Sequence, residues 1–355
     1  MSHPRLSLAL AAPEALPSEG VIALFRPTAE TDLSDLPKAR LEAVQGFAPD
    51  AAALEAKGIK TRPTPGEGYA AAVVFLPRAK AEARAILFET AARVVPGGPI
   101  WVDGVKHDGV DSVLRDLRSW TEVSDPIAKA HGKIFSFRAG TPAPEGWRAV
   151  EGHPAPGFVT LPGVFSADGV DRGSALLAAA LPAKLPGRMA DLGAGWGWLS
   201  AQVLAREGVE SLDLIEAEHA ALDCSKKNIS DPRARFIWAD ATRYTSENRY
   251  SGIVMNPPFH AARAADPGLG LAFIRAAAGL LSLSGTLWMV ANRHLPYEEA
   301  LRGLFHEVEE IGGDGGFKLI RAAKPIAGAT KAPLRAAPEA PRAVASRRRA
   351  PRPRR

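Results

Sequence analysis

The sequence predicts an α/β protein of two similar domains in tandem, followed by a basic tail. Short apolar runs alternate with helical stretches throughout the second half, and a weaker form of this alternation runs through the first half. Several segments of the two halves also match one another in order. Alternating strands and helices are typical of a largely parallel sheet with helices on both faces. We place the two domains at residues 1–150 and 151–328, and the tail at residues 329–355.

The second half carries the clearer alternation, in which apolar runs predict strands and amphipathic stretches predict helices. The predicted strands are residues 188–192, 211–217, 235–239, 252–255, 285–291, 307–311 and 317–321. The predicted helices are residues 198–206, 218–229 and 269–281. A Gly-rich turn separates the last two strands, which predicts a hairpin and an antiparallel strand near the edge of the sheet.

The first half shows the same pattern with less regular elements. We predict strands at residues 21–25, 72–76, 100–102 and 133–137. Helices are predicted between them at residues 38–45, 80–94 and 109–120. The chain of 355 residues is long enough for each half to bury a core of its own.

Matched segments indicate that the second half repeats the first. The segment VVFLPRAK (73–80) aligns with IVMNPPFH (253–260), and GGPIWVDG (97–104) aligns with SGTLWMVA (284–291). Repeated segments that keep their turn residues at matching places favour duplication of one domain. Leu76 stands where the second copy has Asn256, and the first copy has no counterpart of the glycine loop described below. We therefore expect the first copy to have kept its shape and lost catalysis.

Charge is distributed unevenly along the chain. The net charge is +5, yet residues 331–355 hold nine basic residues and one acidic residue, so this tail carries +8. The remaining 35 basic and 38 acidic residues give the rest of the protein −3. An Ala/Pro/Arg-rich segment without apolar periodicity predicts disorder, because it buries too little surface to offset its ordering entropy. It serves either as a solubilising tail or as a non-specific phosphate-binding arm.

Composition disfavours several classes of protein. No apolar run approaches the ~20 residues that cross a bilayer, so we expect no membrane association. The N-terminus lacks the basic start and long apolar core of a signal peptide, which predicts a cytoplasmic protein. Cys224 is the single cysteine, which excludes an internal disulfide and a thiolate metal cluster. We expect Cys224 to be a buried small hydrophobe and expect no metal site.

The segment MADLGAGWGW (189–198) carries the strongest ligand signal. Gly193, Gly195 and Gly197, with Ala194 among them, lie between a predicted strand and a predicted helix. Glycines there permit a tight turn and a close approach of the backbone to a ligand at the carboxyl end of the sheet. The third glycine comes one residue too early for the dinucleotide pattern G-x-G-x-x-G. A plain strand-to-helix turn is the alternative interpretation.

Two acidic residues end the next two predicted strands. Glu216 lies nineteen residues after Gly197, at a place where a carboxylate accepts ribose hydroxyls in nucleoside-binding α/β proteins. It supports a nucleoside ligand without choosing between NAD and other nucleoside cofactors. Asp240 ends the following strand, where it either accepts from an adenine amino group or caps the turn that follows.

The tetrapeptide Asn256-Pro257-Pro258-Phe259 follows the fourth predicted strand at the same rim. An exocyclic amine on a base is a poor nucleophile, because its lone pair is delocalised into the ring. The Asn256 side-chain oxygen and the Pro257 carbonyl can accept its two hydrogens, which directs the lone pair at an electrophilic methyl group. The prolines stiffen the loop, and Phe259 offers a stacking face for a base swung out of its helix. A rigid loop without chemistry is the alternative for the tetrapeptide alone.

The order of these features along the chain predicts an S-adenosylmethionine-dependent methyltransferase. In such an enzyme Asp191, before the first glycine, would hold the loop or meet the cationic methionine end of the cofactor. Asp240 would accept from the adenine amino group, with its capping role still an open alternative. No strong general base is needed before the transfer, because the methylated cation is acidic and loses its proton afterwards.

The chain resembles the class I methyltransferases with an NPP[FY] motif and, more narrowly, the bacterial ribosomal RNA guanine-N2 methyltransferases of the RsmC type. The resemblance covers nearly the whole chain except the basic tail. The matching segments are LPGVFSADGVDRGSALL (161–177), DLGAGWG (191–197), NPPFH (256–260), ANRHLPYE (291–298) and GGFKLIRA (315–322).

This resemblance implies two tandem Rossmann-like methyltransferase domains. The N-terminal domain would be degenerate and would help with folding and RNA binding. The C-terminal domain would bind S-adenosylmethionine and methylate a guanine N2 in small-subunit ribosomal RNA. Phe165, Asp171 and Gly173 match the family segment before the first strand of that domain and would flank the cofactor. The implied partner is ribosomal RNA or the small ribosomal subunit, and the internal pairing of domains favours a monomer.

Four rival functions share some of these features. An NAD-dependent reductase would use Glu216 in the same way, and it predicts protection against heat by a dinucleotide. Glutamine-side-chain methyltransferases use the same tetrapeptide but usually carry Tyr in place of Phe259 and a helical N-terminal domain. A DNA adenine methyltransferase would have a sequence-reading module, and none is recognisable here. A non-catalytic RNA-binding assembly factor fits Leu76 in the first domain but gives Asn256 no role.

Overall fold

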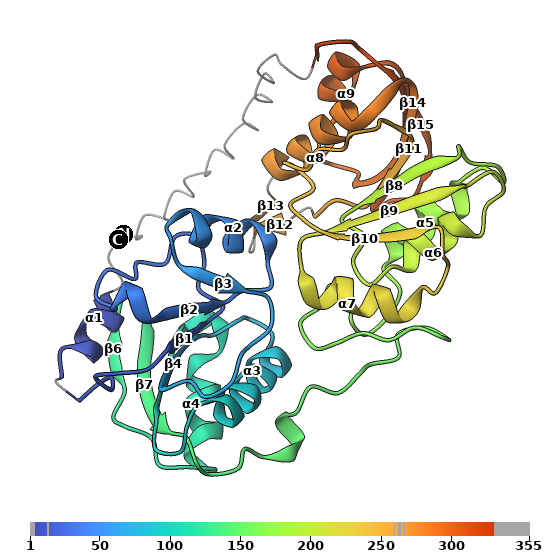
Figure 1. The fold of residues 1–355 in the computed structure, drawn as a ribbon. Helices are drawn as coiled ribbons and strands as arrows, with labels where there is room; N and C mark the ends of the chain where they lie inside the picture. Colours follow the sequence, from blue (N-terminus) through green and yellow to red (C-terminus); the bar gives the residue numbers. More distant parts are fainter. Residues whose placement is uncertain (1–3, 13, 259, 262–263, 266, 330–355) are drawn as a thin grey trace, which may run out of the picture.

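The computed structural model describes residues 4–329 except residues 13, 259, 262–263 and 266. Two seven-stranded sheets form the protein, one in each half of the chain, and the halves lie next to one another (Figure 1). Apart from Ala329, the predicted basic tail falls outside the described residues. Among the residues described, no helix has the length and apolar character needed to span a bilayer.

The first sheet has the strand order β3-β2-β1-β4-β5-β7-β6. Its strands are β1 (Ile22–Phe25), β2 (Leu41–Val44), β3 (Lys60–Arg62), β4 (Ala71–Phe75), β5 (Pro99–Val105), β6 (Ile127–Lys129) and β7 (Gly132–Arg138). Its helices are α1 (Pro4–Leu10), α2 (Ala48–Ala56), α3 (Lys80–Arg93) and α4 (Val110–Arg118), with 3-10 turns at Lys38–Arg40, Lys106–Asp108 and Glu145–Trp147.

The second sheet has the order β10-β9-β8-β11-β14-β16-β15. Its strands are β8 (Arg188–Leu192), β9 (Ser211–Glu216), β10 (Ala234–Trp238), β11 (Tyr250–Met255), β14 (Leu281–Asn292), β15 (Phe305–Gly313) and β16 (Phe317–Pro325). The helices are α5 (Arg172–Ala180), α6 (Trp198–Leu204), α7 (His219–Asn228), α8 (Pro267–Leu280) and α9 (Glu298–Leu304). A two-residue pair, β12 (His260–Ala261) with β13 (Ala264–Ala265), follows β11.

Both sheets are buried on both faces, which explains why their central strands read as nearly continuous apolar runs. Successive side chains of β8 point to opposite faces. Ala190 and Leu192 pack with α8 and α9, whereas Met189 packs with α5 and α6. The first sheet is sandwiched in the same way between α3 and α4 on one face and α1 and α2 on the other.

The strand order is the same in the two sheets, and this confirms the predicted duplication. In each sheet the first five strands in sequence are parallel, and the last two in the order are antiparallel. The equivalence extends to single residues. Arg26 N donates to Val44 O (3.0 Å) after β1, and Gly193 N donates to Ile215 O (2.8 Å) after β8. Both residues have a positive φ, 57° for Arg26 and 77° for Gly193.

The predicted helix at residues 38–45 is wrong. Only Lys38–Arg40 forms a helical turn, and Leu41–Val44 is β2, buried along its whole length between β1 and β3. The residues of this segment are good helix formers, but burial between two neighbouring strands overrides that local preference. The late hairpin was predicted correctly, since β15 and β16 are antiparallel. The domain boundary at residue 150 stays a prediction.

Candidate active site

The carboxyl ends of β8, β9 and β11 bring most of the predicted site residues to one rim. The glycine loop leaves β8 with three residues in left-handed conformations, at φ 77° for Gly193, 57° for Gly195 and 88° for Gly197. A Cβ on Gly195 would meet nothing within 4 Å, whereas one on Gly197 would meet Ile229 Cδ1 at 2.9 Å. Gly195 therefore faces open space at the rim, and Gly197 permits close packing of α6 against α7.

A small cavity of about 50 Å³ joins the glycine loop to the residue after β11. It has room for one or two waters, so by itself it does not hold a nucleoside. Its lining unites seven of the predicted residues with five that were not in that set. The lining residues are Phe165, Ser166, Asp171, Ser174, Asp191, Gly193, Ala194, Gly195, Trp196, Trp198, Leu199 and Asn256.

The side chain of Asn256 is held in one orientation. Its Nδ2 donates to Asp171 Oδ2 (2.7 Å) and to Ser174 Oγ (2.8 Å). A carboxylate only accepts hydrogen bonds, so the amide must turn its NH₂ toward Asp171. Both donor hydrogens of the amide are then used, and among the described residues no donor contacts Asn256 Oδ1. The arrangement leaves that oxygen available as an acceptor.

The start of α5 positions the side chain of Asp171. It is the N-cap of that helix, and its Oδ2 accepts from Ser174 N (2.8 Å). The same oxygen therefore caps α5 and holds Asn256, which lies 85 positions further along the chain. Sequence reasoning missed Ser174. Asp171 was a signal for the helix start, because Asp is a preferred N-cap residue, but nothing local signalled the contact of Ser174 with Asn256.

Asp191 is the most deeply buried carboxylate of the rim, with 1% of its surface exposed. Its Oδ2 accepts from Ser200 Oγ (2.7 Å), while Oδ1 has no partner within the described part of the chain. Burial raises the pKa of Asp191 to about 7, against the opposing hydrogen bond from Ser200. A buried acceptor without a donor is costly, so this oxygen is suited to a donor or cation supplied by a ligand.

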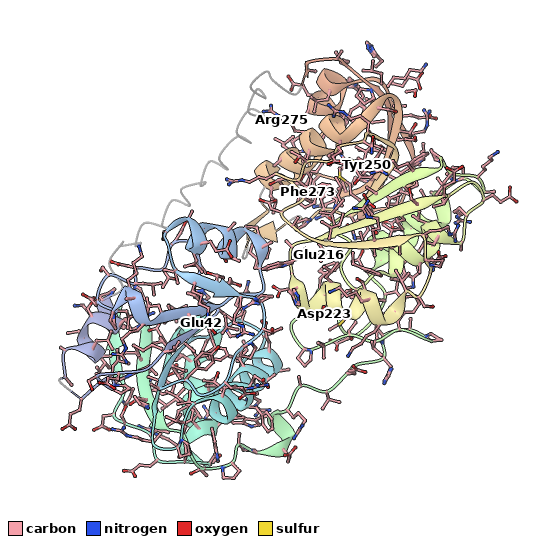
Figure 2. The ribbon with its side chains drawn as sticks, in the orientation of Figure 1. Glu42, Glu216, Asp223, Tyr250, Phe273 and Arg275 are labelled. Carbon is pink, nitrogen blue, oxygen red and sulfur yellow. The ribbon has the colours of Figure 1, made fainter. Side chains whose placement is uncertain are left out.

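Glu216 ends β9 and is tied to the glycine loop. Its Oε2 accepts from Gly195 N (2.7 Å) and its Oε1 from Glu218 N (2.7 Å). Burial raises the pKa of Glu216, although these backbone hydrogen bonds act in the opposite direction. Figure 2 shows Glu216 on the side of the second domain that is turned toward the first. A carboxylate retains further lone pairs beyond these two bonds, so it can still accept from a ligand hydroxyl.

Asp240 and the prolines complete the predicted set. Asp240 Oδ1 accepts from Thr242 N (2.8 Å) and Thr242 Oγ1 (2.6 Å), so the expected capping contact is present, at a turn rather than a helix. Asp240 and Glu216 do not line the cavity beside Asn256. Pro257 is buried and Pro258 is exposed. Phe259 lies outside the described residues.

The segment before α5 covers the glycine loop from outside. Trp196 Nε1 donates to Phe165 O (3.1 Å), and the Trp196 ring packs edge-on against Phe158. The Phe165 side chain itself is 64% exposed at the mouth of the cavity.

Cys224 packs in the same cluster as Trp196, as a buried apolar residue. Burial raises the pKa of its thiol to about 11, which keeps the thiol protonated at neutral pH.

Two further motif segments meet where β14 ends beside the start of β16, and their roles were not predicted. Lys318 is 3% exposed; it donates to Leu295 O (2.6 Å) and forms an ion pair with Glu298. Arg293 Nε donates to Asp314 O (2.6 Å). These bonds fix the loop after β14 against β16. Only the tertiary structure shows that the segments 291–298 and 315–322 act together as a frame for this end of the sheet.

Comparison with known proteins places these features in a family. Residues 156–321 match the family model described as the methyltransferase small domain. Ribosomal RNA small subunit methyltransferase C of Shewanella pealeana is 30% identical over 264 residues, which cover 71% of this chain and 77% of the relative. This chain belongs to the ribosomal RNA small subunit methyltransferase C family.

Other members agree with this assignment to the RsmC family. The relative from Erwinia tasmaniensis is 32% identical over 269 residues, covering 71% of this chain and 75% of its own length. Among solved structures, the T. thermophilus 16S rRNA N2 methyltransferase RsmC in complex with AdoMet and guanosine has a TM-score of 0.75 and 26% identity. The match covers 90% of this chain and 92% of that one, so both domains share the RsmC architecture.

The first domain of this RsmC-family chain shows how a site of this kind is lost. Gln45 is the counterpart of Glu216, because Gln45 comes directly after Val44, which pairs with the end of β1, as Glu216 comes directly after Ile215, which pairs with the end of β8. Each side chain also accepts from the N–H two residues on. The amide of Gln45 donates to Pro27 O (2.7 Å), where Glu216 accepts from Gly195 N. Gln45 is 2% exposed. The Gln45 side chain is therefore buried and bonded within the first domain, and it lacks the second carboxylate oxygen with which Glu216 would accept from a ribose.

Proposed function

We infer that this protein transfers a methyl group from S-adenosylmethionine to the exocyclic N2 amine of a guanine in small-subunit ribosomal RNA. The orientation of Asn256 carries the proposal. Asp171 and Ser174 hold its NH₂, so its Oδ1 is presented as an acceptor at the rim that also holds the glycine loop. The relative of known structure, solved with AdoMet and guanosine, supports the choice of both ligands.

The chemistry follows from what this rim offers. S-adenosylmethionine, when bound, supplies an electrophilic methyl group. Asn256 Oδ1 and the Pro257 carbonyl accept the two hydrogens of the guanine amine, directing its lone pair at that methyl and stabilising the positive charge that develops on nitrogen. The pyrrolidine rings of Pro257 and Pro258 restrict the backbone, so the acceptors are held in place before the substrate arrives. The methylated nitrogen then releases its surplus proton to water.

The residues of the rim fit the cofactor. Asp191 Oδ1, buried without a partner among the described residues, suits the cationic methionine end. The open space over Gly195 allows a ligand to approach the backbone, and Gly193, Ala194 and Gly197 shape that approach. Glu216 would accept the ribose hydroxyls. We assign Asp240, through its remaining oxygen, to the adenine amino group. Phe165 and Asp171 close the outer side, and Phe259 supplies the stacking face.

The proposal is tested by incubating the protein with tritiated S-adenosylmethionine and undermethylated small ribosomal subunits, beside free ribosomal RNA and release-factor protein. Digestion to nucleosides should place the label in N2-methylguanosine. The label should be lost with Asn256→Ala, whose side chain has no acceptor. Label in the protein sample would favour a glutamine methyltransferase. No label in any sample, despite measurable cofactor binding, would favour a non-catalytic RNA-binding factor.

The wider setting of the reaction belongs to the same proposal. We propose that the protein acts in the cytoplasm as a monomer, with ribosomal RNA or the small subunit as its partner. We also propose that the degenerate domain ends near residue 150 and the catalytic domain near residue 328. The basic segment from residue 329 would add sequence-independent attraction to phosphates, which should weaken as salt rises.

A further inference from the structure

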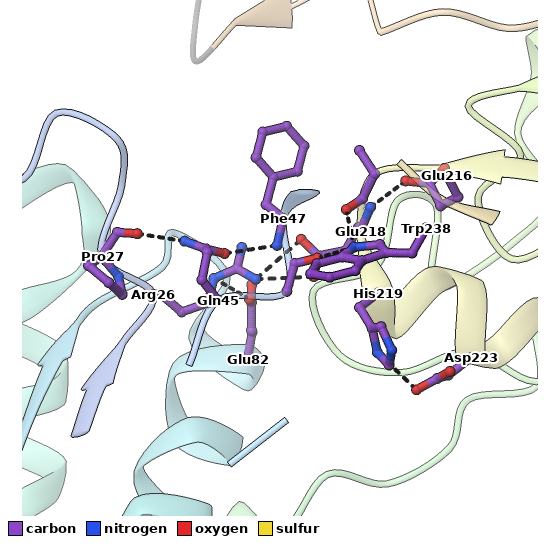
Figure 3. Close-up of polar contacts among 12 residues, drawn as sticks. Arg26, Pro27, Gln45, Phe47, Glu82, Glu216, Glu218, His219, Asp223 and Trp238 are labelled. Carbon is purple, nitrogen blue, oxygen red and sulfur yellow. Dashed lines mark hydrogen bonds and ion pairs between the residues drawn. The ribbon is translucent and has the colours of Figure 1, made fainter. Parts of the chain in front are cut away.

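The two domains are joined through the loops that follow equivalent strands. Phe47, after β2, forms an antiparallel bridge with Glu218, after β9. Ala48 N donates to Ala217 O (2.8 Å), and His219 N donates to Gly46 O (2.8 Å). Figure 3 shows this contact together with the side chains around it. Residues Gly46–Ala48 of the first domain thus pair through a single antiparallel bridge with Ala217–His219, the residues that follow Glu216.

Arg26 reinforces this contact from the first domain. Its Nη1 lies 3.2 Å from both carboxylate oxygens of Glu218, and its Nε is 3.5 Å from Glu82 Oε1 (Figure 3). Arg26 and Glu218 are 29% and 25% exposed, so water screens their attraction only in part. Arg26 also has φ 57°, an uncommon conformation for a residue with a side chain. That backbone turn aims the guanidinium across the domain boundary.

The segment held in this way is continuous with the cofactor rim. Glu218 N, beside the bridge to Phe47, donates to Glu216 Oε1. Trp238 Nε1 donates to both Gly46 O (2.9 Å) and Ala217 O (2.8 Å), and Trp238 lies two residues before Asp240. The contact with the first domain therefore braces the backbone behind both acidic residues assigned to the nucleoside, although no first-domain residue lines the cavity at the rim.

We propose that Arg26 and Gly46 are positioning residues for S-adenosylmethionine, through which the first domain sets the conformation of the Glu216–His219 loop and hence the affinity for the cofactor. The proposal rests on the assignment of Glu216 to the ribose. It gives the degenerate domain a specific part in cofactor binding. By linkage, cofactor binding must strengthen the contact between the domains by the same factor.

Variants with matched controls test the proposal in the full-length protein without RNA. Arg26→Gln removes the charge that reaches Glu218, and Arg26→Lys keeps it. Arg84→Gln is the control, since Arg84 is 35% exposed and binds Asp116 (2.8 Å) within the first domain. Gly46→Ala places a Cβ 2.8 Å from Glu218 Oε1, whereas Gly146→Ala meets nothing within 4 Å. The dissociation constant for S-adenosylmethionine is measured by calorimetry, and the melting temperature is recorded alongside.

We expect Arg26→Gln and Gly46→Ala to raise the dissociation constant roughly fivefold or more. Arg26→Lys should stay near the wild type, and both controls should bind the cofactor as the wild type does. A merely structural role would lower the melting temperature of Arg26→Gln without changing cofactor affinity, and that result would overturn the proposal.

Hydrogen exchange in the wild type gives a second measurement that does not depend on the folding of variants. Saturation with S-adenosylhomocysteine should slow exchange of the Ala48 amide, which donates to Ala217 O, and leave the Ala139 amide, which donates to Gly98 O within the first domain, unchanged. Equal exchange of Ala48 with and without ligand would contradict the inference alone. Failure of the wild type to bind any cofactor would overturn the proposed function and this inference together.

Discussion

Single side chains at this rim act largely by holding one another. Asn256 has its orientation fixed by Asp171 and Ser174, and Asp171 is itself fixed as the cap of α5. The accepting oxygen of Asn256 is therefore positioned by a residue that need not touch the base. A network of this kind is sensitive to substitution, because loss of one partner lets the amide of Asn256 rotate and present a donor where an acceptor is required.

Substitution of Asp171 should separate orientation from charge. Asp171→Ala removes the acceptor for Asn256 Nδ2, and we expect kcat to fall about 10- to 100-fold, since small misplacement of a catalytic group is costly. Asp171→Asn retains an oxygen acceptor and should recover most of the activity. Single-turnover methyl transfer measures both. Equal impairment of the two variants would show that the negative charge, and not the orientation of Asn256, is what matters.

Asp191 should make cofactor affinity depend on pH. Burial raises its pKa to about 7, so the carboxyl is mostly protonated at pH 6 and mostly ionised at pH 7.5. A cationic ligand binds the ionised form, and affinity for S-adenosylmethionine should therefore rise roughly five- to tenfold over this range. Calorimetry at several pH values measures the effect. Asp191→Asn should bind more weakly and without this pH dependence; an unchanged profile would assign the titration to another group.

The Asp191 carboxyl should lower the free energy of unfolding as pH rises, whereas it raises cofactor affinity over the same change. The pKa of Asp191 is raised in the folded state, so between about pH 4 and pH 7 the folded protein holds a proton that the unfolded chain has released. Its contribution to the free energy of unfolding is then fully present below pH 4 and is lost as pH rises to 7. Asp191→Asn should flatten this part of the stability profile, measured by urea unfolding at each pH.

At the scale of elements, the turn between β8 and α6 combines two kinds of glycine. Gly197→Ala forces a Cβ into Ile229 and Ser225 at a positive φ, so we expect a loss of about 2 kcal/mol or more in stability. Gly195→Ala meets open space, so the positive φ alone should cost about 1 kcal/mol. Its methyl group would instead obstruct the ligand. Thermal melts and cofactor titration of both variants distinguish the two effects; equal stability losses would contradict this division.

Elements that carry a strong local pattern were predictable from the sequence. Three such features are the strands of the second sheet, the glycine loop and the repeat. Each combines apolar periodicity with glycines at the turns, and the structure confirms them. The strand β2 was predicted as a helix, because its buried position depends on neighbours that a local pattern does not reveal. Ser174 and Lys318 were missed for the same reason. Their partners lie far away in the sequence, and only the folded chain brings them together.

At the scale of the whole molecule, the two sheets share one chain and one interface, and we expect a single species in solution. Light scattering after size exclusion should give the mass of one chain, 37.5 kDa, at micromolar concentration. The mass should not change with salt, because the domains contact one another within a single chain and not between chains. A mass of twice this value would show that the chain also pairs with a second copy, and would contradict the monomer proposal.

The contact between the domains has a symmetry that follows from the duplication. Gly46 and Ala48 are the counterparts of Ala217 and His219, so the bond from Ala48 to Ala217 and the bond from His219 to Gly46 are the same bond made twice. Phe47 and Glu218, which form the bridge, are counterparts as well. Such a contact is isologous, the kind by which two identical subunits close a twofold dimer. Fusion within one chain frees the halves from being identical, so one half can replace glycine with arginine at its rim and become a support for the other.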